Sequence, residues 1–104
     1  MAMNYYEEGK AHGKARGSWV FDGNTDDATY RHVLAGYDDG DPEVLDLCPN
    51  PLSGEWAGES IPELLGLSVG DPYPDDDDLQ EYEDGFVQGF WDTVIDTARK
   101  MVDE

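Results

Sequence analysis

The sequence has 104 residues, and 25 acidic against 6 basic side chains give it a formal net charge of −19. This length fits one domain. The charge argues against binding to DNA, RNA or an anionic membrane, because each of these requires a basic surface. No stretch approaches ~18 apolar residues, and the first residues lack the apolar run of a secretory signal. The single cysteine, Cys48, cannot form an internal disulfide, which fits a reducing cytoplasm.

The negative charge is concentrated in the last two thirds of the chain. Residues 1–37 carry five acidic and four basic side chains, a net charge of −1, whereas residues 38–104 carry 20 acidic and two basic ones, a net charge of −18. Such self-repulsion destabilises a compact chain unless a cation or a basic partner relieves it. We therefore expect one domain, 1–104, with a near-neutral part (1–37) and a strongly acidic part (38–104).

The near-neutral part predicts two helices and a connector. Residues 4–16 contain no β-branched residue and are predicted to form a helix. Residues 18–22, with the sequence SWVFD, are predicted to be an extended or buried connector. The second helix has Asn24 or Thr25 as its N-cap, and Gly36 is its predicted end.

The acidic part predicts two short helices and one long helix. An Asp-Pro pair begins a short helix over about 41–47, and a proline-rich loop over 49–54 separates it from one or two helical turns over 60–66. The last helix covers about 76–102. Its apolar side chains recur at helical spacing and predict a buried face: Leu79, Phe86, Phe90, Val94 and Met101. The predicted fold is mainly α, with this long C-terminal helix packed on the N-terminal helix and at most one short extended segment.

A short motif occurs twice, once in each of the two helices predicted to pack together. Tyr-Glu-Glu-Gly-x3-Gly ends at Gly9 and Gly13, and Tyr-Glu-Asp-Gly-x3-Gly ends at Gly85 and Gly89. Glycines one helical turn apart form a groove that another backbone can approach closely. We expect the first and last helices to cross at these grooves and to close the domain ends together. A homodimer through one groove is the alternative, and chance similarity remains open.

The chemistry needed by an enzyme is largely missing. His12 and His32 have no second metal ligand at zinc spacing, and Cys48 lies in an acidic stretch where a thiolate is disfavoured. No phosphate-binding loop or nucleophile elbow is present. Residues 38–42 lack the ligand order of a calcium-binding EF-hand loop. Residues 75–78 could hold a divalent ion weakly, although an acidic helix start accounts for them better. The sequence predicts no catalytic residue, no metal site and no cofactor.

The acidic surface is the feature that indicates a function. On the predicted last helix, five carboxylates fall within about a third of the circumference, and a denser group precedes them. A protein that imitates nucleic acid would place such a row in the basic groove of a nucleic-acid-binding protein. Acids over 38–46 and 71–78 could fill gaps in the row, and Ile95 interrupts it. The candidate partner-binding carboxylates are Asp75, Asp76, Asp77, Asp78, Glu81, Asp84, Asp92 and Asp96.

Two alternatives to a nucleic-acid-mimicking surface remain: adaptation to high salt, and an aromatic interface with a protein partner. Acidic, lysine-poor chains are typical of proteins adapted to high salt, although the near-neutral first third argues against a uniform adaptation. A second interface is open because the proline-rich loop ends at Trp56, and an aromatic residue on a rigid loop can anchor a protein partner. The same tryptophan could instead close a small core.

Three stretches carry a resemblance to known proteins. SWVFDGNT (18–25), DGDPEVLDLCPNPLSGEW (39–56) and YEDGFVQGFWD (82–92) resemble small acidic accessory proteins of actinobacterial phages. The resemblance implies a cytoplasmic protein that binds and disables a protein of the host cell, similar in kind to nucleic-acid mimics that inhibit restriction or CRISPR effectors. It implies no catalytic residue.

Together these observations lead to one expected function and to alternatives. We expect a non-enzymatic inhibitor that binds a basic, nucleic-acid-binding host protein and neither nucleic acid nor membrane directly. The first alternative is an adaptor or host-takeover protein that acts through an apolar or aromatic interface. The second is an acidic protein adapted to high salt.

Overall fold

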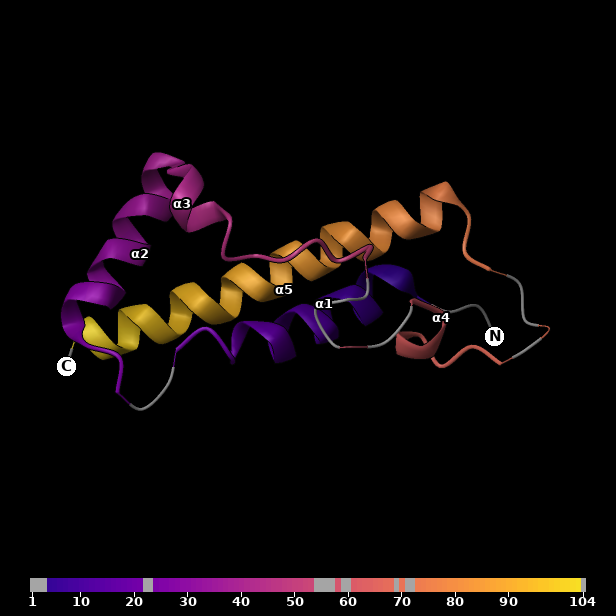
Figure 1. The fold of residues 1–104 in the computed structure, drawn as a ribbon, viewed down its shortest axis with the longest axis horizontal. Helices are drawn as coiled ribbons and strands as arrows, with labels where there is room; N and C mark the ends of the chain where they lie inside the picture. Colours follow the sequence, from indigo (N-terminus) through magenta and orange to yellow (C-terminus); the bar gives the residue numbers. More distant parts are fainter. Residues whose placement is uncertain are drawn as a thin grey trace.

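A computed structural model describes residues 4–21, 24–53, 58, 61–68, 70 and 73–103 of the chain. The described residues form helices and contain no strand, so the predicted mainly α fold is confirmed. The helices are α1 (Tyr5–Gly17), α2 (Asp27–Asp39), α3 (Pro42–Leu45), α4 (Ile61–Leu64) and α5 (Asp76–Asp103). The long α5 runs along most of the molecule and packs mainly against α1, as the sequence predicts (Figure 1).

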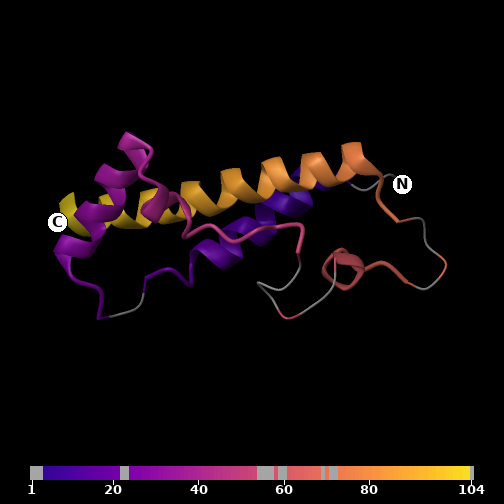
Figure 2. The same ribbon diagram turned by 45° about the horizontal axis from the view of Figure 1, so that its top comes forward.

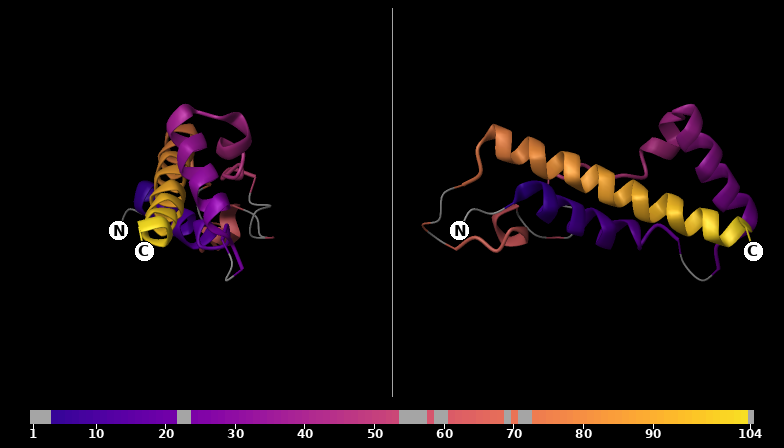
Figure 3. Two further views of the ribbon diagram at one scale, coloured as in Figure 1. Left: turned by 90° about the vertical axis from the view of Figure 1, so that its left-hand side faces the viewer. Right: turned by 180° about the vertical axis from the view of Figure 1, so that it is seen from behind.

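Helices α1 and α5 run side by side and in the same direction. Both begin near the same end of the elongated molecule, and α1 ends about halfway along α5 (Figures 1 and 2). Beyond that point α2 packs on the other half of α5, and α3 follows it (Figure 3). The expectation that this packing closes the domain ends together is wrong, because two parallel helices leave the start of α1 and the end of α5 at opposite ends of the molecule.

Local sequence signals begin and end α1. The side chain of Asn4 caps the helix by accepting a hydrogen bond from the backbone N–H of Glu7 at 3.1 Å. Two glutamates occupy the first turn, and Lys14 and Arg16 occupy the last, as the helix dipole favours. The buried residues of α1 are three glycines, Gly9, Gly13 and Gly17. The helix therefore gains little from burying side chains and depends on close contact with its neighbour.

The repeated glycines lie where α1 meets α5, and the contact is reciprocal. A Cβ atom added to Gly9 would overlap the carbonyl oxygen of Tyr82, and one added to Gly85 would overlap that of Tyr6. One turn further along, Gly13 faces the carbonyl of Phe86 in the same way. Any side chain larger than hydrogen at these positions would push the two backbones apart.

The register of this contact repeats along both helices. Gly89 packs on the backbone of Lys10, and Gly17, the last glycine of α1, faces the carbonyl of Phe90. Equivalent residues of the two motifs therefore face each other across an approximate two-fold axis that runs along the pair. Each glycine groove is filled by the other helix of the same chain, so neither is open to a second copy.

The boundaries of α2 differ from those predicted. Its N-cap is Asp26, whose carboxylate accepts a hydrogen bond from the backbone N–H of Thr29 at 2.9 Å and another from the Thr29 hydroxyl. The helix continues through Gly36 and ends at Gly40, which has a φ of 72°. Gly36 does not stop the helix, because Val44 of α3 occupies the space where a side chain would lie. This glycine serves packing, and the left-handed conformation is reserved for Gly40.

The short helices follow the predicted signals closely. Asp41 caps α3 through a 3.0 Å hydrogen bond to the N–H of Glu43, with Pro42 at the first position. The helix ends at Leu45, two residues before the predicted limit. Helix α4 is followed by a turn at Gly66, which has a positive φ of 72°.

One hydrophobic core connects α2, α3, α4 and α5. Its largest side chains with no exposed surface lie on α5: Tyr82, Phe86, Phe90 and Val94. Val33 of α2, Val44 of α3 and Ile61 of α4 pack into the same cluster. Val20 and Phe21 pack at its edge, consistent with the predicted buried connector. Of the predicted apolar face, Leu79 is partly buried and Met101 is exposed.

Candidate binding surface

The candidate carboxylates on α5 lie on its outward side. Asp77, Glu81, Asp84, Asp92 and Asp96 are all exposed, and the helix rises by roughly 28 Å between the first and the last of them. The buried aromatic side chains of Tyr82, Phe86 and Phe90 pack in the core, and Gly85 and Gly89 face α1. Contact with α1 and the core therefore fixes which residues α5 presents to solvent.

The dense acidic group at the start of α5 also has a structural role. The carboxylate of Asp75 accepts a hydrogen bond from the backbone N–H of Asp78 at 2.9 Å, and the carboxylate of Asp78 accepts one from the N–H of Asp75 at 3.4 Å. This reciprocal pair has the form of a capping box. Asp76 and Asp77 are exposed in the first turn, where the helix dipole stabilises negative charge.

Several of the other candidate carboxylates on α5 form hydrogen bonds or ion pairs with neighbouring side chains of the same helix. Gln80 donates a hydrogen bond to Asp84 at 3.0 Å, and Gln88 donates one to Asp92 at 2.7 Å. Asp96 forms an ion pair with Lys100 at 3.0 Å. These pairs lie one turn apart on the exposed face, and they leave Glu81 as the member with no such partner among the described residues.

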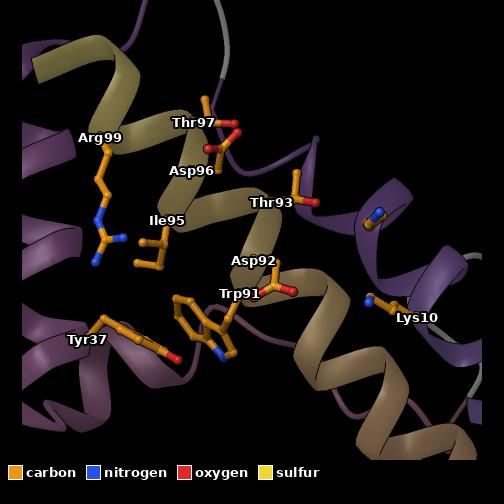
Figure 4. Close-up of a pocket in the computed structure, with 10 residues that line it drawn as sticks. Lys10, Tyr37, Trp91, Asp92, Thr93, Ile95, Asp96, Thr97 and Arg99 are labelled. Atoms are coloured by element: carbon orange, nitrogen blue, oxygen red, sulfur yellow. The ribbon is translucent and has the colours of Figure 1, made fainter. Parts of the chain in front are cut away.

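The two halves of the acidic row have different surroundings. Beside Asp92 and Asp96, a groove of about 730 Å³ runs across α5 between α1 and α2. Three of the six basic residues line it, namely Lys10, Lys14 and Arg99. Figure 4 shows Lys10 on one side of Asp92 and Arg99 extending from α5 on the other. Positive charge therefore surrounds the second half of the row, whereas the first half continues directly from the acidic first turn of α5.

The acids expected to fill gaps in the row lie apart from its dense end. Those over 38–46 belong to the end of α2, to α3 and to the residues beside them, which lie on the half of the molecule away from the start of α5 (Figure 1). Asp71, at the start of the other stretch, lies outside the described residues, as does Trp56, the candidate aromatic anchor.

A group of polar side chains joins α1 to α5 at the edge of the core. His12 Nδ1 lies 2.8 Å from the hydroxyl oxygen of Tyr82, and His12 Nε2 lies 3.9 Å from a carboxylate oxygen of Glu8. The Tyr82 side chain has no exposed surface, and burial raises its pKa to about 12. A hydroxyl with so high a pKa stays protonated at neutral pH and joins α1 to α5.

The next observations concern the reactivity of the cysteine, metal binding and the length of apolar helix stretches. Burial raises the pKa of the half-buried Cys48 thiol to about 11, so very little thiolate is present at neutral pH. Across the described part of the chain, no three His, Cys, Asp or Glu side chains gather into a set that could hold a metal ion. None of the helices described there has an apolar stretch of the length that crossing a bilayer requires.

Sequence reasoning missed the groove of Lys10, Lys14, Arg99, Tyr37 and Trp91. The two lysines are one turn apart, and the glycine motif sets their helix on α5. The register of the two motifs would have placed Lys10 beside Gly89. The contact between Tyr37 and Trp91, with ring centroids 4.8 Å apart, required the packing of α2, which carries no comparable signal in the sequence.

Comparison of the chain with known protein families, with curated proteins and with solved structures found no match.

Proposed function

We propose that this chain is a non-enzymatic inhibitor that binds a basic, nucleic-acid-binding protein through the carboxylates on the outward side of α5. The observation that carries the proposal is the exposed row of acids on a helix that glycine contacts hold against α1. A rigid helix presents its charges at fixed spacing, and a basic groove built for phosphates recognises such an array. The resemblance to phage accessory proteins favours a partner in host defence, of the restriction or CRISPR type, in the host cytoplasm.

Within the row, the first half is the better candidate for contact. Asp76, Asp77, Glu81 and Asp84 are exposed, and they lie in or just after the acidic first turn of α5. Asp92 and Asp96 lie beside Lys10, Lys14 and Arg99, which would repel a basic partner. We therefore place the centre of the interface on the first half of α5, with Asp75 and Asp78 contributing charge as well as the helix cap.

Capture from an actinobacterial lysate tests this proposal. The immobilised protein should retain a basic nucleic-acid-binding protein at low salt and release it as the salt concentration rises, because exposed charge contacts are screened. A double-stranded oligonucleotide should displace the same protein, since it would compete for one groove. A retained partner that neither salt nor DNA displaces would contradict the mimic.

One observation favours the alternative of an apolar interface. A pocket of about 280 Å³ beside α2 and α3 is lined mainly by apolar side chains: Val20, Phe21, Val33, Val44 and Leu47. Leu45 and Leu47 are also more than a third exposed. A partner bound here would resist high salt, and Leu47→Asp would abolish its capture while reversal of the α5 carboxylates would not.

The high-salt alternative has a separate test. A protein adapted to high salt would need molar salt to fold, because its own charges repel one another at low ionic strength. Our proposal expects a cooperative thermal transition already in 0.1 M salt. Absence of folded protein below molar salt would favour the adaptation instead.

A further inference from the structure

The groove across the second half of α5 concentrates positive charge in a strongly acidic protein. Lys10 and Lys14 come from α1, and Arg99 comes from α5. In Figure 4 the labelled lysine and the arginine lie on the two sides of the α5 ridge that carries Asp92. Half of the basic residues of the chain thus line one groove, a distribution that general solubility does not require.

The carboxylates of the groove already have partners, whereas its cations do not. Asp96 pairs with Lys100 at 3.0 Å, and Asp92 accepts the Gln88 amide at 2.7 Å. Among the described residues, no carboxylate lies within ion-pair distance of Lys10, Lys14 or Arg99. The groove therefore offers hydrogen-bond donors and positive charge to a ligand, and Lys100 pairs with Asp96, one of its two carboxylates.

A buried donor lies in the same groove. Trp91 lines it with only 6 % of its surface exposed, and its indole N–H donates to no acceptor within the described part of the chain. A buried tryptophan N–H normally has an acceptor, because leaving it without one costs free energy. The donor is thus available to an acceptor atom of a bound molecule.

An aromatic surface completes the groove. The ring of Tyr37 packs on Trp91 with centroids 4.8 Å apart and an interplanar angle of 37°, and Tyr37 remains 39 % exposed. Its outer face is free to stack on a flat ring, as aromatic side chains do on a nucleobase. The volume of about 730 Å³ lies within the range of small-molecule sites.

We propose that this groove binds a nucleotide. The Tyr37 and Trp91 pair takes the base, Trp91 donates its N–H to an acceptor atom of the ligand, and Lys10, Lys14 and Arg99 bind the phosphates. The dense acidic start of α5 does not prevent this, because Asp78 lies 14 residues before Asp92, roughly 21 Å along the helix, and the Debye length is ~8 Å at physiological salt. This site is separate from the proposed partner-binding half of α5.

Calorimetric titration with magnesium-free ATP tests the proposal on the full chain. We expect saturable binding of one ATP per chain. Lys14→Gln and Arg99→Gln should each weaken binding about tenfold, as expected for loss of one charge-assisted hydrogen bond. Arg31→Gln is the matched control, because Arg31 is an exposed cation of α2 outside the groove and its replacement changes the net charge equally. Its effect should stay within twofold.

Two further titrations separate the nucleotide from other anions. Tyr37→Ala should weaken ATP binding about tenfold and leave the weaker binding of inorganic tripolyphosphate unchanged, because only ATP has a base to stack. Absence of saturable ATP binding by protein that circular dichroism shows to be folded would overturn the proposal. Equal losses in Arg31→Gln and Lys14→Gln, tripolyphosphate binding as tight as that of ATP, or tighter binding of a single-stranded oligonucleotide would also overturn it.

Discussion

Helix α5 packs in two different ways along its length. Its first half meets α1 through glycines on both helices, and each glycine faces a backbone carbonyl of the partner helix. Its second half meets α2 and the core through large side chains, among them Trp91, Val94 and Ile95. One half leaves no space for an added methyl group, and the other depends on the volume of the side chains it buries.

The two halves also differ in the surface they present. In the first half, the buried side of α5 holds glycines and aromatic residues, and acidic residues occupy the outward side. In the second half, a different part of the circumference is buried, and there Ile95 is buried between the exposed Asp92 and Asp96. The way a helix packs therefore determines how continuous a charged row it can carry.

Adding a methyl group to the glycine half should have the largest effect. Gly13→Ala would place a Cβ against the Phe86 carbonyl, and we expect a loss of roughly 3 kcal/mol of unfolding free energy. This exceeds the ~1 kcal/mol that alanine gains over glycine in helix propensity. Urea unfolding measures the loss.

Gly17→Ala is the graded control for this substitution. Its added Cβ would lie 2.8 Å from the Phe90 carbonyl oxygen and 3.2 Å from the Thr93 Cβ, a milder conflict at the end of α1, and the loss should be smaller. If either alanine variant is more stable than the parent chain, the close packing of α1 on α5 is wrong.

Removing volume from the second half should have the next largest effect. Val94 has no exposed surface, and Val94→Ala removes two methyl groups and leaves a cavity, with an expected loss of about 2 kcal/mol. Thermal unfolding measures it. An unchanged melting temperature would show that this half is not packed as described.

The polar contact between α1 and α5 should contribute less, and in a pH-dependent way. Tyr82→Phe removes the hydrogen bond to His12 and should cost about 1 kcal/mol at pH 7.

The pH dependence follows from the raised pKa of Tyr82. Because the folded pKa is about 12 and the ordinary value for tyrosine is 10.0, the folded state favours the protonated hydroxyl. Its stabilisation is present below pH 10 and is lost as the pH rises towards 12. The decline of the melting temperature over this range should be shallower in Tyr82→Phe, and an equal decline in both proteins would exclude Tyr82 as its source.

The smallest effect is expected at Cys48 and concerns reactivity. With a thiol pKa of about 11 instead of 9.0, the thiolate fraction at pH 8 falls by roughly 100-fold. Reaction with a disulfide reagent should be slow in the native protein and fast in urea. Equal rates in both conditions would mean that the thiol is not protected by the fold.

The sequence predicts those parts of the fold that depend on local signals. The Asp41-Pro42 start of α3, the length of α5 and the pairing of α1 with α5 follow from caps, periodicity and the repeated glycines. The role of Gly36 could not be predicted, because an end signal and a packing glycine look alike until Val44 is placed beside it. The direction of α1 relative to α5 also depends on three-dimensional packing.

In the candidate binding surface, too, only the features that depend on local sequence could be predicted. That the acids of α5 are exposed follows from helical periodicity, and the structure has each of the five on the outward side. The surrounding cations could not be predicted, because Lys10 and Lys14 line the same groove as Asp92 only through the register of two helices that are far apart in the chain. Tyr37 contacts Trp91 only because α2 packs on α5.

Charge reversal in the two halves of α5 tests the proposed interface most directly. Glu81→Lys/Asp84→Lys and Asp92→Lys/Asp96→Lys change the net charge equally, at exposed positions, and lysate capture of the partner is measured for both at low salt. We predict that the first pair abolishes capture of the basic partner, that the second weakens it only severalfold, and that both variants keep their helical circular dichroism. Capture that survives the first reversal, or that is lost equally with both, would contradict an interface centred on the first half of α5.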